Sequence, residues 1–251
     1  MQQGKDQKGK RILAFGDIHG CAVAFDALLE AVTPGPDDLV ITLGDYIDRG
    51  PDSKEVVEHL IALHGYLDIV TLAGNHEEMV LEWRKKGHVA ALTWWANGGL
   101  PTLRSYCQGD ERWLLEMFWK SYFSPETEDY HAAACELIPE EHWDFFENCI
   151  DWYETEEHIF VHGLVNPLLE MAEQSPHVMH WAGFRAKARP HKSGKKVICA
   201  HTPQYDGRPK DIGHATCIDT YLYGGQWLTC MDIDSGRFYQ ANYLGEIRII
   251  D

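Results

Sequence analysis

The sequence has no run of about 18 apolar residues, the length that a membrane-spanning helix requires. Its first ten residues, MQQGKDQKGK, lack the apolar core of a signal peptide, so export by that route is not expected. The seven cysteines form no CxxC pair and are odd in number, which excludes a zinc ribbon and disfavours a disulfide framework. We therefore expect buried, reduced thiols in a cytoplasmic protein.

Basic residues are also scarce. Lys and Arg number 22 against 39 Asp and Glu, which gives a formal net charge of −17. A charge of this size and sign disfavours nucleic acids and anionic membranes as partners. It does not exclude a small anionic substrate, because a site can carry a local field of the opposite sign.

The composition that remains is that of a globular protein, with 45% apolar and 24% charged residues in 251. We expect a flexible tail over residues 1–10 and a single domain over residues 11–251. Short apolar runs at 11–15, 39–43 and 69–73 each end at a glycine or just before one. The first two are followed by helical patterns, which predicts a parallel sheet of strand–loop–helix units.

The middle of the chain, about 77–155, is rich in Trp, Tyr, Glu and His and is predicted to be a helical insertion. Further strands are predicted at 159–161, 197–199, 215–218 and 227–233. Gly224-Gly225 and Asp234-Ser-Gly236 separate the last segments, which we interpret as antiparallel hairpins.

Polar clusters follow the three early strands: GDIHG at 16–20, GDYIDRG at 44–50 and GNHE at 74–77. The carboxyl ends of parallel strands meet at one edge of a sheet, and ligand sites form there. We therefore expect these polar residues to converge, namely Asp17, His19, Asp45, Asn75 and His76. Two later apolar runs end in His162 and His201 and add to the same site.

Two Asp, one Asn and three of these four His would be the ligands of a two-metal centre. A carboxylate can bridge two cations, and an amide oxygen is a hard ligand without charge. Two divalent ions about 3.5–4 Å apart can hold a hydroxide between them and neutralise phosphate oxygens. The residue types therefore favour in-line attack on phosphorus.

The ordered set GDIHG, GDYIDRG and GNHE with two later histidines resembles the phosphoprotein phosphatase branch of the calcineurin-like metallophosphoesterases. The similarity is greater to bacterial and bacteriophage-lambda-like members than to eukaryotic ones, and segments 94–103, 160–167 and 217–220 share it. The resemblance implies an α/β fold of two mixed sheets packed as a sandwich and flanked by helices, with a helical insertion. Tyr221 and Gly163 depart from the pattern, which more often has Gly and Ala at these positions.

The resemblance also implies a role for each matching residue. Asp17 and His19 bind the first metal, Asp45 bridges both metals, and the second metal is bound by Asn75, His162 and His201. His76 protonates the leaving oxygen, and Asp48 holds its ring in the right tautomer. Arg49 and Arg185 bind the phosphate of the substrate. The expected cofactor is a pair of divalent ions, Mn²⁺ first, with Fe, Zn or Co as alternatives.

These roles predict a Ser/Thr protein phosphatase, in which hydroxide between the metals attacks phosphorus, with a phosphorylated protein or a small phosphate ester as substrate. The alternative is a hydrolase of symmetric dinucleoside tetraphosphates such as diadenosine tetraphosphate, which uses the same chemistry. A non-catalytic binding module is disfavoured because every expected ligand is present, and a nuclease is disfavoured by the net charge.

Two further features have two interpretations each. Residues 185–196, RAKARPHKSGKK, carry six basic residues and form either a solvated loop or a cationic rim that attracts phosphorylated substrate. A group of tryptophans either packs the core of the insertion or forms a wall against the substrate. Its members are Trp83, Trp94, Trp95, Trp113, Trp119 and Trp143.

Overall fold

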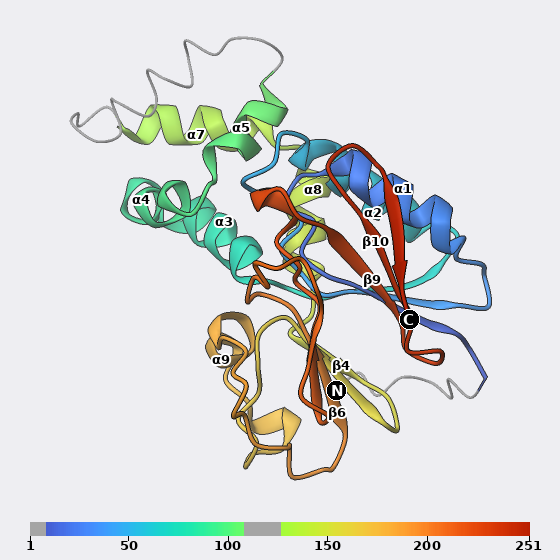
Figure 1. The fold of residues 1–251 in the computed structure, drawn as a ribbon. Coiled ribbons are helices and arrows are strands. Elements are labelled where there is room, and N and C mark those ends of the chain that lie inside the picture. The colour runs from blue at the N-terminus through green and yellow to red at the C-terminus, as the bar shows by residue number, and fades with distance from the viewer. Residues whose placement is uncertain (1–8, 108–126) are drawn as a thin grey trace.

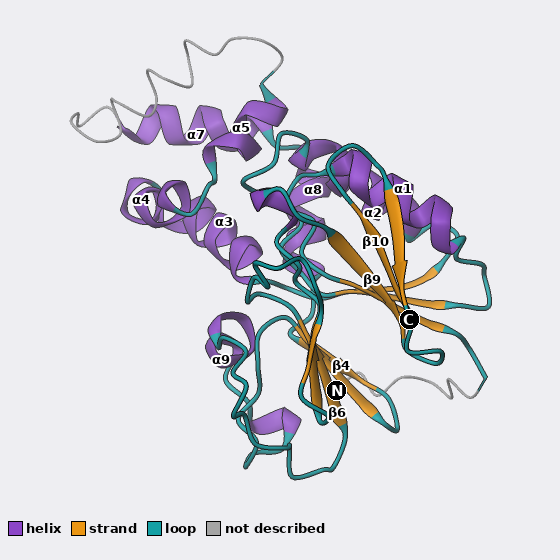
Figure 2. Cartoon of the chain, viewed as in Figure 1, coloured by secondary structure: helices purple, strands orange, loops and turns teal. Residues whose placement is uncertain are grey.

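The structure is a computed structural model that describes residues 9–107 and 127–251 (Figure 1). Most of the predicted tail at 1–10 lies outside the described residues, as do Trp113 and Trp119. The division into a tail and one domain therefore stays a prediction. Within the described residues, the strands form two sheets with helices around them (Figure 2).

The first sheet has six strands in the order β11-β10-β9-β1-β2-β3. Its strands are β1 Ile12–Phe15, β2 Leu39–Thr42, β3 Asp68–Thr71, β9 Leu228–Asp232, β10 Phe238–Ala241 and β11 Ile247–Ile250. β1 pairs in parallel with β2, and β2 with β3, as the strand–loop–helix pattern predicts. β9 pairs antiparallel with both β1 and β10, which confirms the hairpin around Asp234-Ser-Gly236.

The second sheet has five strands in the order β4-β5-β6-β8-β7. Its strands are β4 Trp152–Glu154, β5 His158–Val161, β6 Lys196–Cys199, β7 Lys210–Asp211 and β8 Ala215–Cys217. The predicted hairpin between 215–218 and 227–233 is wrong, because β8 pairs in parallel with β6 whereas β9 belongs to the other sheet. The chain around Gly224-Gly225 crosses from one sheet to the other, so these glycines mark a crossover instead of a hairpin turn.

Helices lie on both sides of the sheets (Figure 1). They are α1 Ala22–Val32, α2 Ser53–Leu63, α3 Asn75–Lys86, α4 His88–Ala96, α5 Leu100–Tyr106, α7 Thr127–Leu137, α8 Glu140–Asn148 and α9 Pro176–Trp181. The helices from α3 to α8 lie between β3 and β4, in the segment predicted to be helical. No helix in the described ranges has the length and apolar character needed to cross a membrane.

The core has a layer between the sheets and a layer under the helices. Leu39 and Ile41 of β2 pack with Phe160 of β5 and Ile198 of β6 between the sheets. Phe25 and Leu28 of α1 belong to the layer under the helices. This layer also holds four of the tryptophans, Trp83, Trp94, Trp95 and Trp143, which confirms core packing for them. The observed architecture is the predicted sandwich of two mixed sheets.

Candidate metal centre

The polar loops after β1 and β2 are tied to each other by main-chain hydrogen bonds. The amides of Ile18 and His19 donate to the Asp45 carbonyl at 3.1 and 2.8 Å. The second sheet joins the same site, because the amide of His201, just after β6, donates to Asp17 Oδ1 at 3.3 Å. Both sheets thus bring their predicted site residues to one place, as expected for loops that follow the carboxyl ends of strands.

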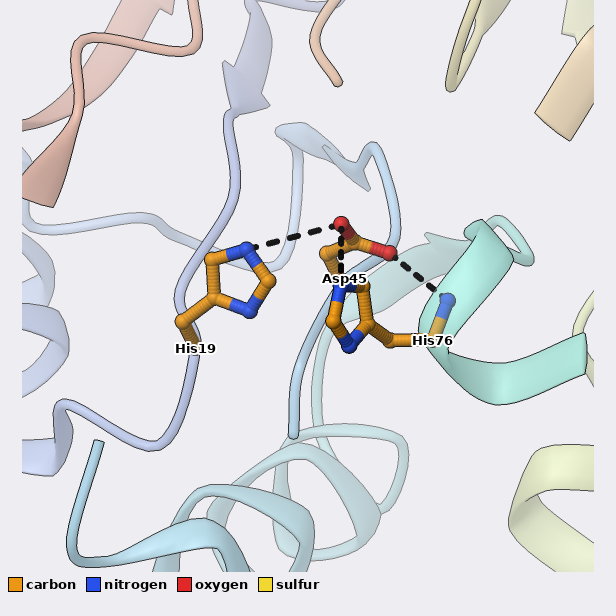
Figure 3. A group of neighbouring side chains, drawn as sticks. All are labelled: His19, Asp45 and His76. Atoms are coloured by element: carbon orange, nitrogen blue, oxygen red, sulfur yellow. Dashed lines mark hydrogen bonds and ion pairs between the residues drawn. The ribbon is translucent and has the colours of Figure 1, made fainter. Parts of the chain in front are cut away.

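Asp45 lies at the centre of this site and is buried (Figure 3). Its Oδ2 is 3.5 Å from His19 Nε2 and 3.8 Å from His76 Nε2. Its Oδ1 is 3.3 Å from His162 Nε2. One carboxylate therefore faces imidazoles on both of its oxygens, which is the arrangement that a bridging ligand needs.

Asn75 connects the two later histidines. Its Oδ1 is 3.1 Å from His162 Nε2 and 2.8 Å from His201 Nδ1. Burial lowers the pKa of His201 and lowers that of His162 to about 3, so both imidazoles are neutral and keep a lone pair for a cation.

The donor set fits two cations that share one ligand. His19, Asp45 and His76 form one group, and Asp45, His162 and His201 form a second, with the ligand atoms of each group within 4.8 Å of one another. The first group contains His76, whereas the sequence predicts Asp17 as the metal ligand. Asp17 still lies nearby, with Oδ2 at 3.9 Å from His19 Nε2.

His76 is distinguished from the other histidines of the site by a carboxylate on its Nδ1. Asp48 Oδ2 is 2.5 Å from that nitrogen, and Asp48 also accepts hydrogen bonds from Trp94 Nε1 and Thr102 Oγ1 at 2.8 and 2.6 Å. Burial alone would lower the pKa of His76, but Asp45 and the Asp48 hydrogen bond outweigh it and raise that pKa. His76 Nε2 is buried and has no hydrogen-bond partner.

The backbone at the site is strained. Within the described ranges, seven non-glycine residues have positive φ, and five of them are predicted site residues: His19, Asp45, Asp48, Arg49 and His201. Such conformations cost energy and persist where the surroundings enforce them, often at functional sites. Gly74 is required for a steric reason, because a Cβ at this position would collide with the Asp45 carboxylate.

The two predicted phosphate ligands have different surroundings. Arg49 Nη1 donates to His19 Nε2 at 2.8 Å, and its guanidinium lies 4.1 Å from the centre of the Tyr223 ring. Arg185 is exposed, and its side chain makes no hydrogen bond or ion pair with the rest of the described chain. The structure thus brings Arg49 into the cluster but not Arg185.

The basic segment 185–196 is partly neutralised. Lys192, Lys195 and Lys196 form ion pairs with acidic residues at 2.8, 2.8 and 2.6 Å, and the partners are Glu170, Glu154 and Asp211. Three of the six basic residues are thus paired with carboxylates, and the choice between a solvated loop and a cationic rim stays a prediction.

Two buried acidic residues of the site, Glu77 and Asp219, have no role predicted from the sequence. Glu77 accepts hydrogen bonds from the amides of Asp45, Tyr46 and Gly74 at 2.8, 2.9 and 2.9 Å and so fixes the loop that presents Asp45. Asp219 interacts with Asp17, and burial raises its pKa to about 6. A usable signal was present for Asp219, because it follows strand β8 as Asp17 follows β1.

A second histidine cluster lies beside the site. His180 of α9 places Nδ1 at 2.8 Å from Glu78 Oε2 and Nε2 at 3.0 Å from Asp151 Oδ1. Trp181 Nε1 donates to the same Glu78 oxygen at 3.0 Å, and its ring lies 6.4 Å from that of His201. The cluster connects α9 to α3, the helix that carries Asn75 and His76.

Comparison with known proteins agrees with this geometry. Residues 10–227 match the calcineurin-like phosphoesterase family, and the chain belongs to that family. The described fold and its buried Asp, His and Asn cluster are therefore those of a metallophosphoesterase, a phosphoester hydrolase that uses divalent metals.

Two curated relatives are similar over part of the chain. "Serine/threonine-protein phosphatase 1" of Salmonella typhimurium is 35% identical over 91 residues, which cover 36% of this chain and 39% of that protein. "Bis(5'-nucleosyl)-tetraphosphatase, symmetrical" of Acidovorax sp. is 41% identical over 63 residues, which cover 25% of this chain and 22% of that protein. The matched stretches thus span less than half of each relative.

A solved structure extends the likeness over the whole fold. A cold-active protein-tyrosine phosphatase of a psychrophilic Shewanella species superposes with a TM-score of 0.59 at 14% identity, covering 100% of this chain and 86% of that one. At this identity the match shows the fold alone.

Proposed function

We propose that this protein is a metal-dependent phosphomonoester hydrolase that removes phosphate from phosphoserine and phosphothreonine in proteins. One observation carries the proposal: Asp45 is shared by two groups of imidazoles, one of which contains His76, whose buried Nε2 makes no hydrogen bond. The Salmonella relative supports the choice of substrate.

The metals would be held by the six residues assigned from the sequence, Asp17, His19, Asp45, Asn75, His162 and His201. Two divalent cations would supply an activated water at neutral pH and offset the charge of the phosphate. Mn²⁺ is the proposed ion, and the mixed oxygen and imidazole donors also suit Fe, Zn or Co.

His76 is assigned as the proton donor instead of a metal ligand. The Asp48 carboxylate on Nδ1 stabilises a protonated ring, and a protonated imidazole has no lone pair for a cation. Asp48 orients the ring through Nδ1, so that Nε2 gives its proton to the leaving oxygen of the serine or threonine. Arg49, and Arg185 once substrate is bound, would hold the phosphate oxygens.

A second candidate is hydrolysis of symmetric dinucleoside tetraphosphates, which the Acidovorax relative supports. The metal centre serves both reactions, so the two differ in the contacts made with the organic part of the substrate.

The test is a substrate panel on chelator-treated protein with and without added Mn²⁺. A phosphoserine peptide, a phosphothreonine peptide, a phosphotyrosine peptide, p-nitrophenyl phosphate and diadenosine tetraphosphate would be compared by kcat/KM. We expect Mn²⁺-dependent turnover with the phosphoserine and phosphothreonine peptides preferred. A dinucleotide preference would establish the second candidate, and full activity without metal would refute both.

A further inference from the structure

Three tyrosines form a continuous series of edge-to-face rings that leads away from the metal centre. We call Tyr205, Tyr221 and Tyr223 the tyrosine ladder. The ring centres of Tyr205 and Tyr221 are 4.8 Å apart with planes at 80°, and those of Tyr221 and Tyr223 are 4.8 Å apart at 76°. The side chain of Tyr205 is 71% exposed, so the outer end of the ladder is open to solvent.

The inner end of the ladder touches the site. The Tyr223 ring lies 4.9 Å from the His19 ring, and the Arg49 guanidinium stacks on it at 4.1 Å. A group next to a phosphate held by Arg49 would therefore lie close to Tyr223, and the ladder continues from there to Tyr221 and Tyr205.

The conformation of Tyr221 points to a role for its side chain. With φ 63° and ψ 43°, it adopts the left-handed conformation that glycine accepts freely and that a bulky residue rarely adopts. Its amide donates to Asp219 Oδ1 at 3.0 Å, and its carbonyl accepts from the amides of Gly224 and Gln226 at 3.1 Å each. Glycine could make all three hydrogen bonds without strain, so what tyrosine adds here is the ring.

Tyr221 also belongs with the strained residues of the site. Among the seven non-glycine residues with positive φ in the described ranges, the five predicted site residues and Tyr221 border the metal centre, and Thr33 ends helix α1. Strain held at a ligand site is a reason to look for function.

We propose that the tyrosine ladder binds an aromatic side chain next to the phosphorylated residue of a polypeptide substrate, with Tyr221 as the specificity-determining residue. This inference rests on the proposed phosphatase function. Tyr221 and Tyr205 meet nearly at right angles, so a planar ring that packs on the face of one presents its edge to the face of the other, both favourable geometries. The Tyr223 ring centre lies 4.1 Å from the Arg49 guanidinium, and the Tyr221 ring centre lies 4.8 Å from that of Tyr223. Successive residues of an extended peptide are about 3.3 Å apart, so a side chain one or two positions from a phosphoserine held by Arg49 can span these steps.

Charge favours a peptide over a dinucleotide at the ladder. A tetraphosphate chain carries several negative charges and needs several cations along its length. Among the described residues, Arg49 is the cation that stacks on a ring of the ladder. A single phosphate followed by an apolar ring suits these surroundings better.

The experiment compares two phosphoserine peptides that differ at one position next to the phosphoserine, Phe in one and Ala in the other. With Mn²⁺-loaded wild type, kcat/KM is expected to be about three- to tenfold higher for the Phe peptide, the range of one aromatic pair. Tyr221→Gly and Tyr205→Ala are expected to bring this ratio close to one, whereas Tyr221→Phe keeps it. Tyr66→Ala is the matched control, since Tyr66 is also exposed (66%) and lies in the turn between α2 and β3.

Four results separate the possibilities. A Phe preference that Tyr221→Gly abolishes and Tyr66→Ala retains supports the inference. Equal kcat/KM for both peptides in the wild type, or an unchanged preference in Tyr221→Gly, overturns the inference while the phosphatase function stands. A loss of diadenosine tetraphosphate hydrolysis in Tyr221→Gly without a change in the peptide ratio assigns the ladder to a nucleobase and also overturns it. No turnover of either peptide by the wild type refutes the proposed function and this inference together.

Discussion

Two buried histidines have nearly the same surroundings and differ at one nitrogen. In each, Nδ1 faces a carboxylate that also accepts an indole N–H: Asp48 with Trp94 for His76, and Glu78 with Trp181 for His180. The Nε2 of His180 is hydrogen-bonded to Asp151 at 3.0 Å, whereas the Nε2 of His76 makes no hydrogen bond and lies 3.8 Å from Asp45 Oδ2.

The difference separates a structural histidine from one that can act on a substrate. With carboxylates on both nitrogens, His180 is a fixed cation, and these carboxylates outweigh burial to raise its pKa to about 9. His76 is hydrogen-bonded to Asp48 through Nδ1 in the same way, but its Nε2 makes no hydrogen bond and faces Asp45 in the cluster. A perturbed pKa therefore does not identify the catalytic group by itself.

The largest expected effect comes from removing the open nitrogen. His76→Asn should lower kcat on a phosphoserine peptide by about 10²–10⁴-fold, the usual contribution of general acid catalysis, with KM changed only a few-fold. His180→Asn should lower kcat by less than about tenfold, since His180 lies outside the metal cluster and acts only through the contact between α9 and α3. Steady-state kinetics of the two Mn²⁺-loaded variants checks this. Turnover of His76→Asn within threefold of wild type would remove the distinction between the histidines.

The next effect concerns the two carboxylates. Asp48→Asn should lower kcat by about 10²-fold, because an amide neither enforces the tautomer of His76 nor stabilises its charge. Asp151→Asn is the matched control, and its kcat should stay near that of wild type. Similar losses in both variants would mean that Asp48 acts on stability alone.

His180 should affect the stability of the fold, and this contribution should depend on pH. The folded pKa of His180, about 9, lies above the ordinary value of 6.5. Its stabilisation is therefore fully present below pH 6.5 and is lost as pH rises through 9. The difference between the folded and the ordinary pKa corresponds to a contribution of about 3 kcal/mol to the free energy of unfolding.

Urea unfolding at pH 6, 7.5 and 9.5 measures the contribution of His180 to the free energy of unfolding. Wild type should lose stability relative to His180→Gln as pH rises, so that the gap between them narrows. A gap that stays constant over this range would show that His180 is not a structural cation.

The smallest expected effect on kcat comes from removing the indole N–H of Trp94 or of Trp181. Trp94→Phe removes one donor from Asp48, and kcat should fall about three- to tenfold because a hydrogen bond to a charged group is worth about 1.5–3 kcal/mol, only part of which reaches the reaction. Trp181→Phe removes the corresponding donor from Glu78 and should change kcat less than twofold. A larger loss in Trp181→Phe would reverse the expected order.

Much of this site could be predicted from the sequence because the signals are local. Short apolar strands that end in glycine and polar residues locate Asp17, Asp45 and Asn75, since the carboxyl ends of strands share an edge. The pairing of β8 and β9 could not be predicted in this way. Gly224-Gly225 gives the same turn signal whether the chain returns along one sheet or crosses to the other.

The supporting contacts were also beyond sequence reasoning. His180 meets Glu78 across 102 residues, and no periodicity or motif relates the two. Glu77 is recognisable only once the amides of Asp45 and Tyr46 are known to need an acceptor. The tyrosine ladder likewise depends on the positive φ of Tyr221, which side-chain type alone does not reveal.

The central claim is that His76 gives a proton to the leaving oxygen, and the dependence on the leaving group tests it most directly. The loss of kcat/KM in His76→Asn would be measured for p-nitrophenyl phosphate, whose leaving group departs readily as an anion, and for a phosphoserine peptide, whose alkoxide needs a proton. We predict a loss at least tenfold greater for the peptide, and equal losses for both substrates in His180→Gln. Equal losses for both substrates in His76→Asn would contradict the account.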